Sequence, residues 1–333
     1  MKVLQIHSQK IGSEETKDFA PFVMESFNNL TSSDIDILGL NTGYSLSNFL
    51  KNGRLLRKNV FKYDIVHIQY GGYFAFFVLL FCSGKKTIVS YCGSDIFGSY
   101  GGSHVKILIY NFFLPKVNYF VQRKVSKIIV KSEVLQDQIL FKYRYKTLII
   151  PNGVDIRRFE NIDRIYERDK FGWDVNDFVI LFNLRRGVTI DTVKNLGLAN
   201  DTIKQLNLLD SSIIFYPIQN LTRDEVSKIL IAGDCLLLTS FHEGSPNIVK
   251  ESLAANLPVV TVNCGDVAFL LDGVTNSHVS LEYNAVELSN LLLRVIKEDS
   301  RTNGFSHIVK KGLDINQTNK KILEVYNELS SNR

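Results

Sequence analysis

The sequence predicts an α/β protein built from two doubly wound domains that face an interdomain cleft. Short apolar runs alternate with segments of helical spacing along nearly the whole chain, which is typical of parallel sheets covered by helices. A chain of 333 residues is also too long for one ordinary hydrophobic core. We therefore expect one domain over residues 1–160 and a second over residues 161–315.

In the first domain, short apolar runs predict strands, and apolar residues three and four positions apart predict helices. The strands fall at 3–7 and 35–40, within 64–72 and 86–95, and at 126–132; the helices fall at 19–30, 73–82 and 133–142. The first loop carries one glycine, Gly12, so the G-x-G-x-x-G fingerprint of dinucleotide-binding domains is absent. We therefore do not expect a dinucleotide-dependent oxidoreductase.

The second domain follows a turn in which Pro151 and Gly153 suit a reversal of the chain. Its predicted strands fall at 178–183, 212–218, 236–238 and 259–262, and its helices at 198–206, 224–232, 248–254, 286–297 and 322–329. The alternation again indicates a parallel sheet with helices on its faces.

The composition is that of a globular protein, with 45% hydrophobic and 22% charged residues. No uninterrupted apolar run is long enough to cross a bilayer, and the start of the chain predicts a strand rather than a signal peptide. The four cysteines are far apart and lack metal-ligand spacing. We expect reduced thiols and a cytoplasmic location.

Basic residues concentrate in residues 104–146, which contain nine Lys and Arg against two Asp and Glu. Aromatic and aliphatic side chains are interleaved with them, as on proteins that bind the surface of an anionic membrane. A buried amphipathic helix with a solvated basic face explains the pattern equally well. No nucleic-acid-binding module is present, so nucleic acid is not an expected partner.

The most informative stretch is the loop between the strand at 236–238 and the helix at 248–254. Pro246 suits the first turn of that helix, whose unpaired N–H groups favour an anion. Glu243 and Glu251 would repel a bare phosphate, yet carboxylates are strong acceptors for hydroxyl groups. A nucleotide-sugar, with a diphosphate and two polyols, satisfies both conditions. The alternative is an ordinary connection with two solvated glutamates.

The segment from Glu243 to Glu251, Glu-Gly-Ser-Pro-Asn-Ile-Val-Lys-Glu, resembles the E-x7-E motif of retaining glycosyltransferases of the GT-B fold, family 4 (glycosyl transferases group 1). The continuation Ala-Ala-Asn-Leu-Pro-Val-Val and Cys-Gly-Asp is similar to that family, as is Ile-Pro-Asn-Gly-Val-Asp at 150–155. The resemblance implies two Rossmann-like domains and a last helix, over 316–333, that crosses back to the N-terminal domain.

The resemblance also implies transfer of a sugar, with retained anomeric configuration, from a nucleotide-diphosphate sugar to a hydroxyl acceptor. Glu251 would bind the ribose, Glu243 the transferred sugar, and Lys194 with Arg185 or Arg186 the diphosphate, although a solvated basic loop is the alternative for these cations. The remaining donor-loop residues would be Gly244, Ser245, Pro246, Asn247 and Ile248. No metal or other cofactor is expected, and the donor would be UDP- or GDP-linked.

On the acceptor side the resemblance points to Gly12, His67 and Asp95, with Cys92 where the family has His. His67 lies in an apolar strand, so it is either a core histidine or a ligand-facing one. Asp95 is either a hydrogen-bond acceptor for the acceptor hydroxyl, in the manner of a general base, or a helix cap. We expect Glu243, Asp95 and Lys194 to form the catalytic set.

Two other functions are compatible with the same fold. A nucleotide-sugar 2-epimerase would consume its substrate without an acceptor, and a degenerate glycosyltransferase subunit would bind the donor without transfer. For a transferase, the basic and aromatic segment favours a lipid-linked or cell-surface polysaccharide precursor as the acceptor.

Overall fold

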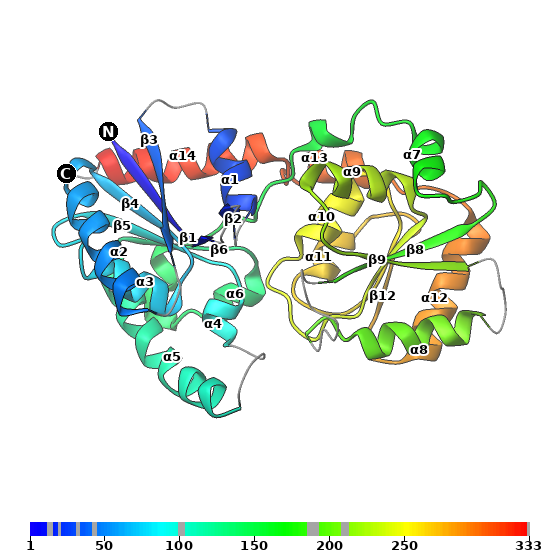
Figure 1. The fold of residues 1–333 in the computed structure, drawn as a ribbon, viewed down its shortest axis with the longest axis horizontal. Helices are drawn as coiled ribbons and strands as arrows, with labels where there is room; N and C mark the ends of the chain where they lie inside the picture. The colour runs from blue at the N-terminus through cyan, green and yellow to red at the C-terminus, as the bar shows by residue number, and fades with distance from the viewer. Residues whose placement is uncertain are drawn as a thin grey trace. The chain divides into compact units, whose positions relative to one another are not determined.

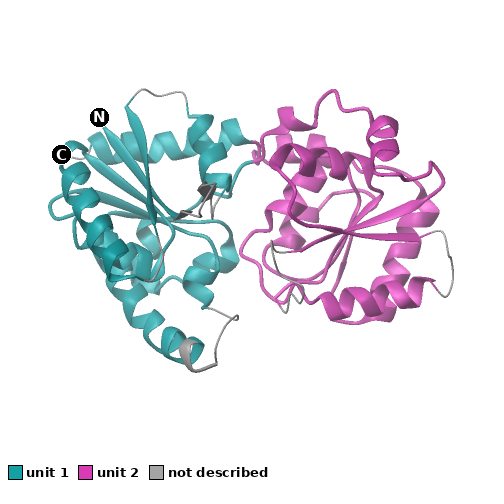
Figure 2. Ribbon diagram, in the orientation of Figure 1, with its two compact units in different colours: residues 1–153, 315–333 teal, residues 154–314 magenta. Residues whose placement is uncertain are grey.

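A computed structural model describes residues 1–11, 16–18, 21–30, 34–41, 45–98, 104–184, 193–207 and 213–331. The chain divides into two compact units, and each unit has its own mainly or entirely parallel sheet and its own hydrophobic core (Figure 2). Unit 1 contains Met1–Gly153 and Ile315–Arg333, and unit 2 contains Val154–Asp314. The predicted α/β class and the two Rossmann-like sheets are confirmed.

The sheet of unit 1 has the order β2-β1-β4-β5-β6-β7, and β3 also pairs with β1. All pairs are parallel except that of β1 with β2. The strands are β1 (Val3–Ile11), β2 (Thr16–Asp18), β3 (Ile35–Asn41), β4 (Ile65–Gln69), β5 (Lys86–Tyr91), β6 (Lys127–Val130) and β7 (Thr147–Ile149).

The helices of unit 1 cover both faces of this sheet (Figure 1). They are α1 (Pro21–Asn28), α2 (Leu46–Asn59), α3 (Gly72–Leu79), α4 (Ser94–Phe97), α5 (His104–Lys124), α6 (Glu133–Asp137) and α14 (Ile315–Ser331), with 3₁₀ turns η1 (Val60–Lys62) and η2 (Phe141–Lys146). Side chains alternate along each strand, so Ile65 packs with Tyr326 of α14, whereas its neighbour Val66 packs with the core on the other face.

The helix predicted over 133–142 is shorter than expected. It ends at Asp137, because the backbone N–H of Leu140 donates to the Gln122 side chain at 3.1 Å. Leu140 has an extended backbone (ψ 131°), and the chain continues as η2. A tertiary contact from α5 therefore replaces the helical hydrogen bond that local spacing predicted.

The sheet of unit 2 is entirely parallel and has the order β12-β11-β10-β8-β9. Its strands are β8 (Phe178–Asn183), β9 (Ile213–Ile218), β10 (Cys235–Leu238), β11 (Val259–Val262) and β12 (His278–Ser280). Every residue of β10 and β11 is buried, which explains their continuous apolar sequence. The helices are α7 (Arg164–Lys170), α8 (Leu196–Asn207), α9 (Arg223–Ala232), α10 (Asn247–Ala254), α11 (Val267–Leu271), α12 (Ala285–Glu298) and α13 (Gly304–Lys310), with a 3₁₀ turn η3 (Ile156–Phe159).

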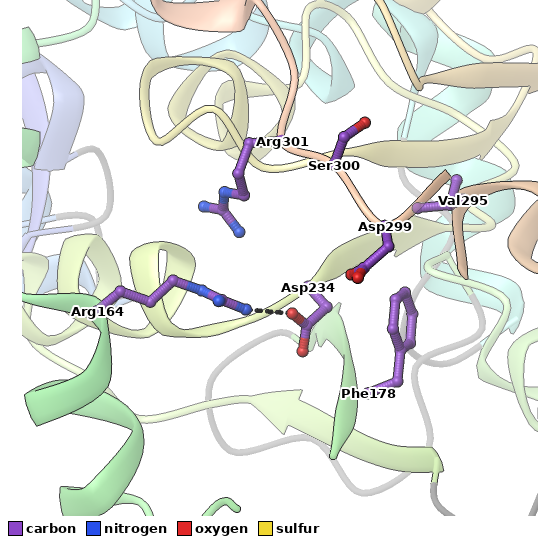
Figure 3. A pocket seen from close by; sticks show the side chains of 7 residues that line it. All are labelled: Arg164, Phe178, Asp234, Val295, Asp299, Ser300 and Arg301. Carbon is purple, nitrogen blue, oxygen red and sulfur yellow. Dashed lines mark hydrogen bonds and ion pairs between the residues drawn. The ribbon is translucent and has the colours of Figure 1, made fainter. Parts of the chain in front are cut away.

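A charged cluster lies where β8 and β10 begin, around a pocket of about 90 Å³ (Figure 3). Asp234 accepts hydrogen bonds from Arg164, from Arg168 at 2.9 Å and from the backbone N–H of Val179 at 2.8 Å. Arg301 donates to the carbonyl oxygens at the C-caps of α9 and α10, at 2.6 and 2.8 Å. Burial lowers the pKa of Arg301 to about 10, so it remains charged. These contacts join helices to strands, which gives the cluster a structural role.

Candidate functional site

The carboxyl end of β10 leads into the loop that carries the E-x7-E motif. The loop runs from Thr239 to Pro246, and α10 begins at Asn247, so Pro246 is the N-cap and not a residue of the first turn. Its N-cap residue, Pro246, has no side-chain hydrogen bond to the helix. The first turn of α10 therefore presents backbone N–H groups and the positive end of the helix dipole at the loop.

A second loop, from β8 to α8, is tied to the first. The Thr239 hydroxyl donates to the carbonyl oxygens of Lys194 and Asn195 at 2.8 and 3.0 Å, and the backbone N–H of Phe241 donates to Val193 at 3.0 Å. Asn195 has a left-handed backbone (φ 53°), which the short Asn side chain tolerates. These contacts fix the backbone of Lys194 beside the motif.

The side chains of Lys194 and Glu243 meet at this junction. Lys194 Nζ lies 2.5 Å from Glu243 Oε1, and the two side chains are only 13% and 16% exposed. Such charge-assisted hydrogen bonds are strong when water is largely excluded. The structure thus brings together two of the three residues predicted to be catalytic.

The second glutamate of the motif has a partner that sequence reasoning missed. Glu251 lies on α10 with a side chain 7% exposed, and its Oε1 is 2.5 Å from Nη1 of Arg223. Arg223 is the first residue of α9. A basic residue opposes the helix dipole at that position, and this unfavourable placement is the sequence signal that could have identified it.

The segment after β11 packs closely against the backbone of Glu243. Gly265 has φ +58°, and a Cβ there would lie 2.9 Å from the Glu243 carbonyl oxygen. The next residue, Asp266, is buried, and its Oδ1 has no hydrogen-bond partner among the described residues. Burial raises the pKa of Asp266 to about 6, opposed by the charge of Lys250 and a hydrogen bond from Ser245.

Lys250 is the buried cation of the motif. It is fully shielded from solvent, and its Nζ donates to the Ser245 hydroxyl at 3.3 Å. Gly244, Pro246 and Ile248 are buried, whereas Ser245 and Asn247 are half-buried. Positive charge therefore lies under the loop as well as beside it, an arrangement that suits an anionic ligand.

Asp95 is enclosed by backbone donors at the ends of β4 and β5. Its carboxylate accepts from the N–H groups of Gly71 at 2.6 Å, Gly93 at 2.7 Å and Cys92 at 3.0 Å. The residue is completely buried, and burial raises its pKa while these hydrogen bonds oppose the rise. Asp95 is the second residue of α4, whose N-cap is Gly93, so the structure does not place it as the helix cap. Its part in transfer stays a prediction.

His67 lies in the core of unit 1. Its Nδ1 is 2.6 Å from the Tyr326 hydroxyl, and its Nε2 is 2.8 Å from the Ser90 hydroxyl. Burial lowers the pKa of His67 to about 3, with a smaller effect from Lys131, so the ring is neutral. The Tyr326 oxygen also accepts from Gln5, at 3.0 Å. The geometry favours the core histidine over a ligand-facing one.

Three predicted site residues, Gly12, Arg185 and Arg186, lie outside the described residues. Where the structure describes the chain, no three His, Cys, Asp and Glu side chains gather in a group that could hold a metal ion. The expectation of a metal-independent reaction stays a prediction. Nor is any described helix long and apolar enough to cross a membrane.

Two family models match the chain. The model described as Glycosyltransferase Family 4 matches residues 33–158, and the model described as Glycosyl transferases group 1 matches residues 196–298. No curated protein matches the chain in sequence.

Solved structures share the fold at low sequence identity. HepE (Alr3699) from Anabaena, in complex with UDP, is 16% identical, with 98% of this chain and 100% of that chain covered and a TM-score of 0.72. Sucrose-phosphate synthase from Thermosynechococcus elongatus is 14% identical over 100% of both chains, with a TM-score of 0.73. UDP-GlcNAc 2-epimerase from Methanocaldococcus jannaschii is 12% identical over 98% and 100%, with a TM-score of 0.58.

Proposed function

The chain belongs to the glycosyltransferases of the GT-B fold, family 4 and group 1, and we propose that it is a retaining, metal-independent hexosyltransferase. The proposed reaction moves a sugar from a nucleotide-diphosphate sugar to a hydroxyl acceptor. The observation that carries the proposal is the meeting of Lys194 with Glu243 beside the start of α10. A UDP-linked donor is supported by HepE, which was solved with UDP.

In this proposal the donor lies along the carboxyl ends of the unit 2 strands. Lys194 and the N–H groups at the start of α10 hold the diphosphate, which gains negative charge as the bond to the sugar breaks. Glu243 binds hydroxyls of the transferred sugar, and Glu251 binds the ribose. Asp95 acts by fixing the loops after β4 and β5, on the acceptor side.

The proposal is tested with Lys194→Ala and Glu251→Ala, each assayed for sugar transfer from UDP- and GDP-linked hexoses. Each variant is expected to lose transfer while keeping a cooperative thermal transition. Lys204→Ala is the matched control, because Lys204 forms an exposed pair with Asp201 on α8 at 3.5 Å. Full transfer activity in either of the first two variants would refute the assigned roles.

The proposed acceptor is a lipid-linked or cell-surface polysaccharide precursor at the cytoplasmic face of an anionic membrane. Support comes from α5, on which Leu108 and Phe112 are 73% and 65% exposed and Ile109 and Phe113 are also exposed. Lys116 Nζ lies 5.2 Å from the Phe112 ring centre. Leu114 and Val121 of the same helix are buried, so an apolar and basic face of α5 points outward in addition to its packed face.

The competing function is nucleotide-sugar 2-epimerisation. It is considered because the chain shares its fold with the Methanocaldococcus jannaschii epimerase. The two activities differ in one readout. An epimerase converts UDP-GlcNAc without any acceptor, whereas the proposed transferase releases nucleoside diphosphate in proportion to the glycosylated acceptor.

A further inference from the structure

We propose that Arg223 is a positioning residue that makes the nucleotide site selective for ribonucleoside over 2′-deoxyribonucleoside diphosphates. It would do so by fixing the carboxylate of Glu251. The inference rests on the proposed function, because it takes the ligand of Glu251 to be the ribose. It adds a residue that neither the motif nor the fold specifies.

The backbone of Arg223 is held firmly. Thr222 caps α9 and accepts from the N–H of Glu225 at 3.3 Å, while the Glu225 carboxylate accepts from the N–H of Thr222 at 2.7 Å. This reciprocal pair fixes the residue that directly precedes Arg223. The Arg223 side chain therefore leaves a rigid helix start and reaches Glu251 on α10.

The placement of Arg223 is unfavourable for its own helix. A cation at a helix N-terminus meets the positive end of the helix dipole, which disfavours it there. Glu251, for its part, is a carboxylate whose side chain is 7% exposed, and an ionised group so shielded needs a charged partner. The pair satisfies Glu251, so the function of Arg223 lies at the carboxylate and not in α9.

The consequence for specificity follows from the geometry of a carboxylate. Its two oxygens offer about four acceptor positions, so Arg223 on Oε1 is compatible with hydroxyl donors on the same group. The planar guanidinium restricts the rotation of the carboxylate more than an ammonium would. A fixed carboxylate pairs with both ribose hydroxyls, and a 2′-deoxyribose forfeits one of these charge-assisted hydrogen bonds.

The test measures dissociation constants of UDP and 2′-deoxy-UDP by calorimetry on the full chain, with GDP and 2′-deoxy-GDP as a second pair. The wild type is expected to prefer the ribonucleotide about tenfold or more, the factor that one charge-assisted hydrogen bond supplies. Arg223→Gln is expected to reduce the ratio to about twofold or less. Arg223→Lys keeps the charge without the planar fork and is expected to fall between them.

Arg158→Gln is the matched control. Arg158 pairs at 3.3 Å with Asp224, the neighbour of Arg223, and this pair contains no residue of the E-x7-E motif. It should leave the ratio unchanged. An unchanged ratio in folded Arg223→Gln and Arg223→Lys would overturn the inference and leave the proposed function standing. Equal binding of both sugars by the wild type, or no binding of any of the four nucleotides, would overturn the ribose role of Glu251 itself.

Discussion

Lys194 and Glu243 lie 49 positions apart in the sequence, yet their side chains meet at 2.5 Å in a place where both are largely shielded from water. The contact joins the loop after β8 to the loop after β10. A ligand at this edge of the sheet would face one cation and one anion at once, which suits a molecule with both phosphates and hydroxyls.

Glu243→Gln is predicted to lower kcat about a hundredfold or more while changing the affinity for UDP less than about threefold. The carboxylate is proposed to contact the transferred sugar, and a preorganised charge at a reacting centre is worth about that factor. Steady-state kinetics and calorimetry with UDP separate the two effects. A large loss of UDP affinity with kcat preserved would place Glu243 at the nucleotide instead.

Gly265→Ala is predicted to weaken binding of the donor and to destabilise unit 2. A methyl group there would lie 2.9 Å from the Glu243 carbonyl oxygen, in addition to the strain of φ +58°. Gly172→Ala is the control, because Gly172 has φ +70° with nothing within 4 Å of the added Cβ. The strain is thus common to both variants. Equal donor affinity in the two would show that the contact with Glu243 is unimportant.

Asp266→Asn is predicted to become more stable, relative to the wild type, as the pH rises. The pKa of Asp266 is raised from 3.8 to about 6, so folding favours the neutral carboxyl. The neutral Asp266 carboxyl therefore stabilises the folded wild type fully below pH 3.8. This stabilisation is lost as the pH rises through about 6, which lowers the wild type's free energy of unfolding by about 3 kcal/mol. Urea unfolding at intervals from pH 4 to pH 7 measures the difference in unfolding free energy.

The groups that face Asp266 are Lys250, Ser245 and Glu243, and all three are unchanged in the variant. Asp224→Asn serves as the control, because the Asp224 side chain is 84% exposed. A constant difference between Asp266→Asn and the wild type over this pH range would contradict the predicted titration.

Tyr326→Phe is predicted to lower the free energy of unfolding by about 2–3 kcal/mol. The hydroxyl serves both His67 and Gln5 in a fully buried position, and unpaired buried polar groups cost about 1–3 kcal/mol each. Tyr63→Phe should cost less than about 1 kcal/mol, since water can replace its hydroxyl at Asp36. Chemical denaturation measures both. A smaller loss for Tyr326 than for Tyr63 would contradict the account of His67.

The double variant Phe112→Ser, Phe113→Ser is predicted to reduce binding to vesicles of phosphatidylcholine with phosphatidylglycerol by about tenfold or more. Removing each ring forfeits roughly 1.5–3 kcal/mol of burial if the face enters the bilayer. Phe269→Ser is the matched control, since Phe269 is also exposed and has Lys311 Nζ 4.0 Å from its ring centre. Co-sedimentation measures the affinities. If wild-type binding did not depend on the phosphatidylglycerol content of the vesicles, the proposed electrostatic attraction to an anionic membrane would be contradicted.

The secondary structure around the motif was predictable because a continuous apolar run, typical of a buried strand, is followed there by apolar residues at helical spacing. The apolar run of β10 and the helical spacing of α10 depend on local sequence alone, and both were predicted close to their observed bounds. The end of the chain was harder. The spacing alone predicted a helix over 322–329, whereas the resemblance implied one over 316–333, and α14 spans Ile315–Ser331. Its first turns include the buried Asn319, which accepts a hydrogen bond from the Ser26 hydroxyl at 2.6 Å, a polar contact that apolar spacing does not reveal.

Partners that are distant in sequence could not be predicted. His67 is satisfied by Tyr326, 259 positions away, so its apolar setting left two readings open. Arg223 gave no motif signal, because its meaning depends on the approach of α9 to α10. The premature end of α6 likewise depends on Gln122 of another helix. Each case is a tertiary contact that local propensity does not contain.

The most direct test of the donor site is a crystal structure of the chain with bound UDP. The account predicts the diphosphate at Lys194 and the first turn of α10, and the ribose hydroxyls within about 3 Å of the Glu251 carboxylate. Two results would contradict this account. UDP could bind instead at the opposite end of the sheet, between Arg164 and Arg301, or Glu251 could turn away from the ribose of bound UDP.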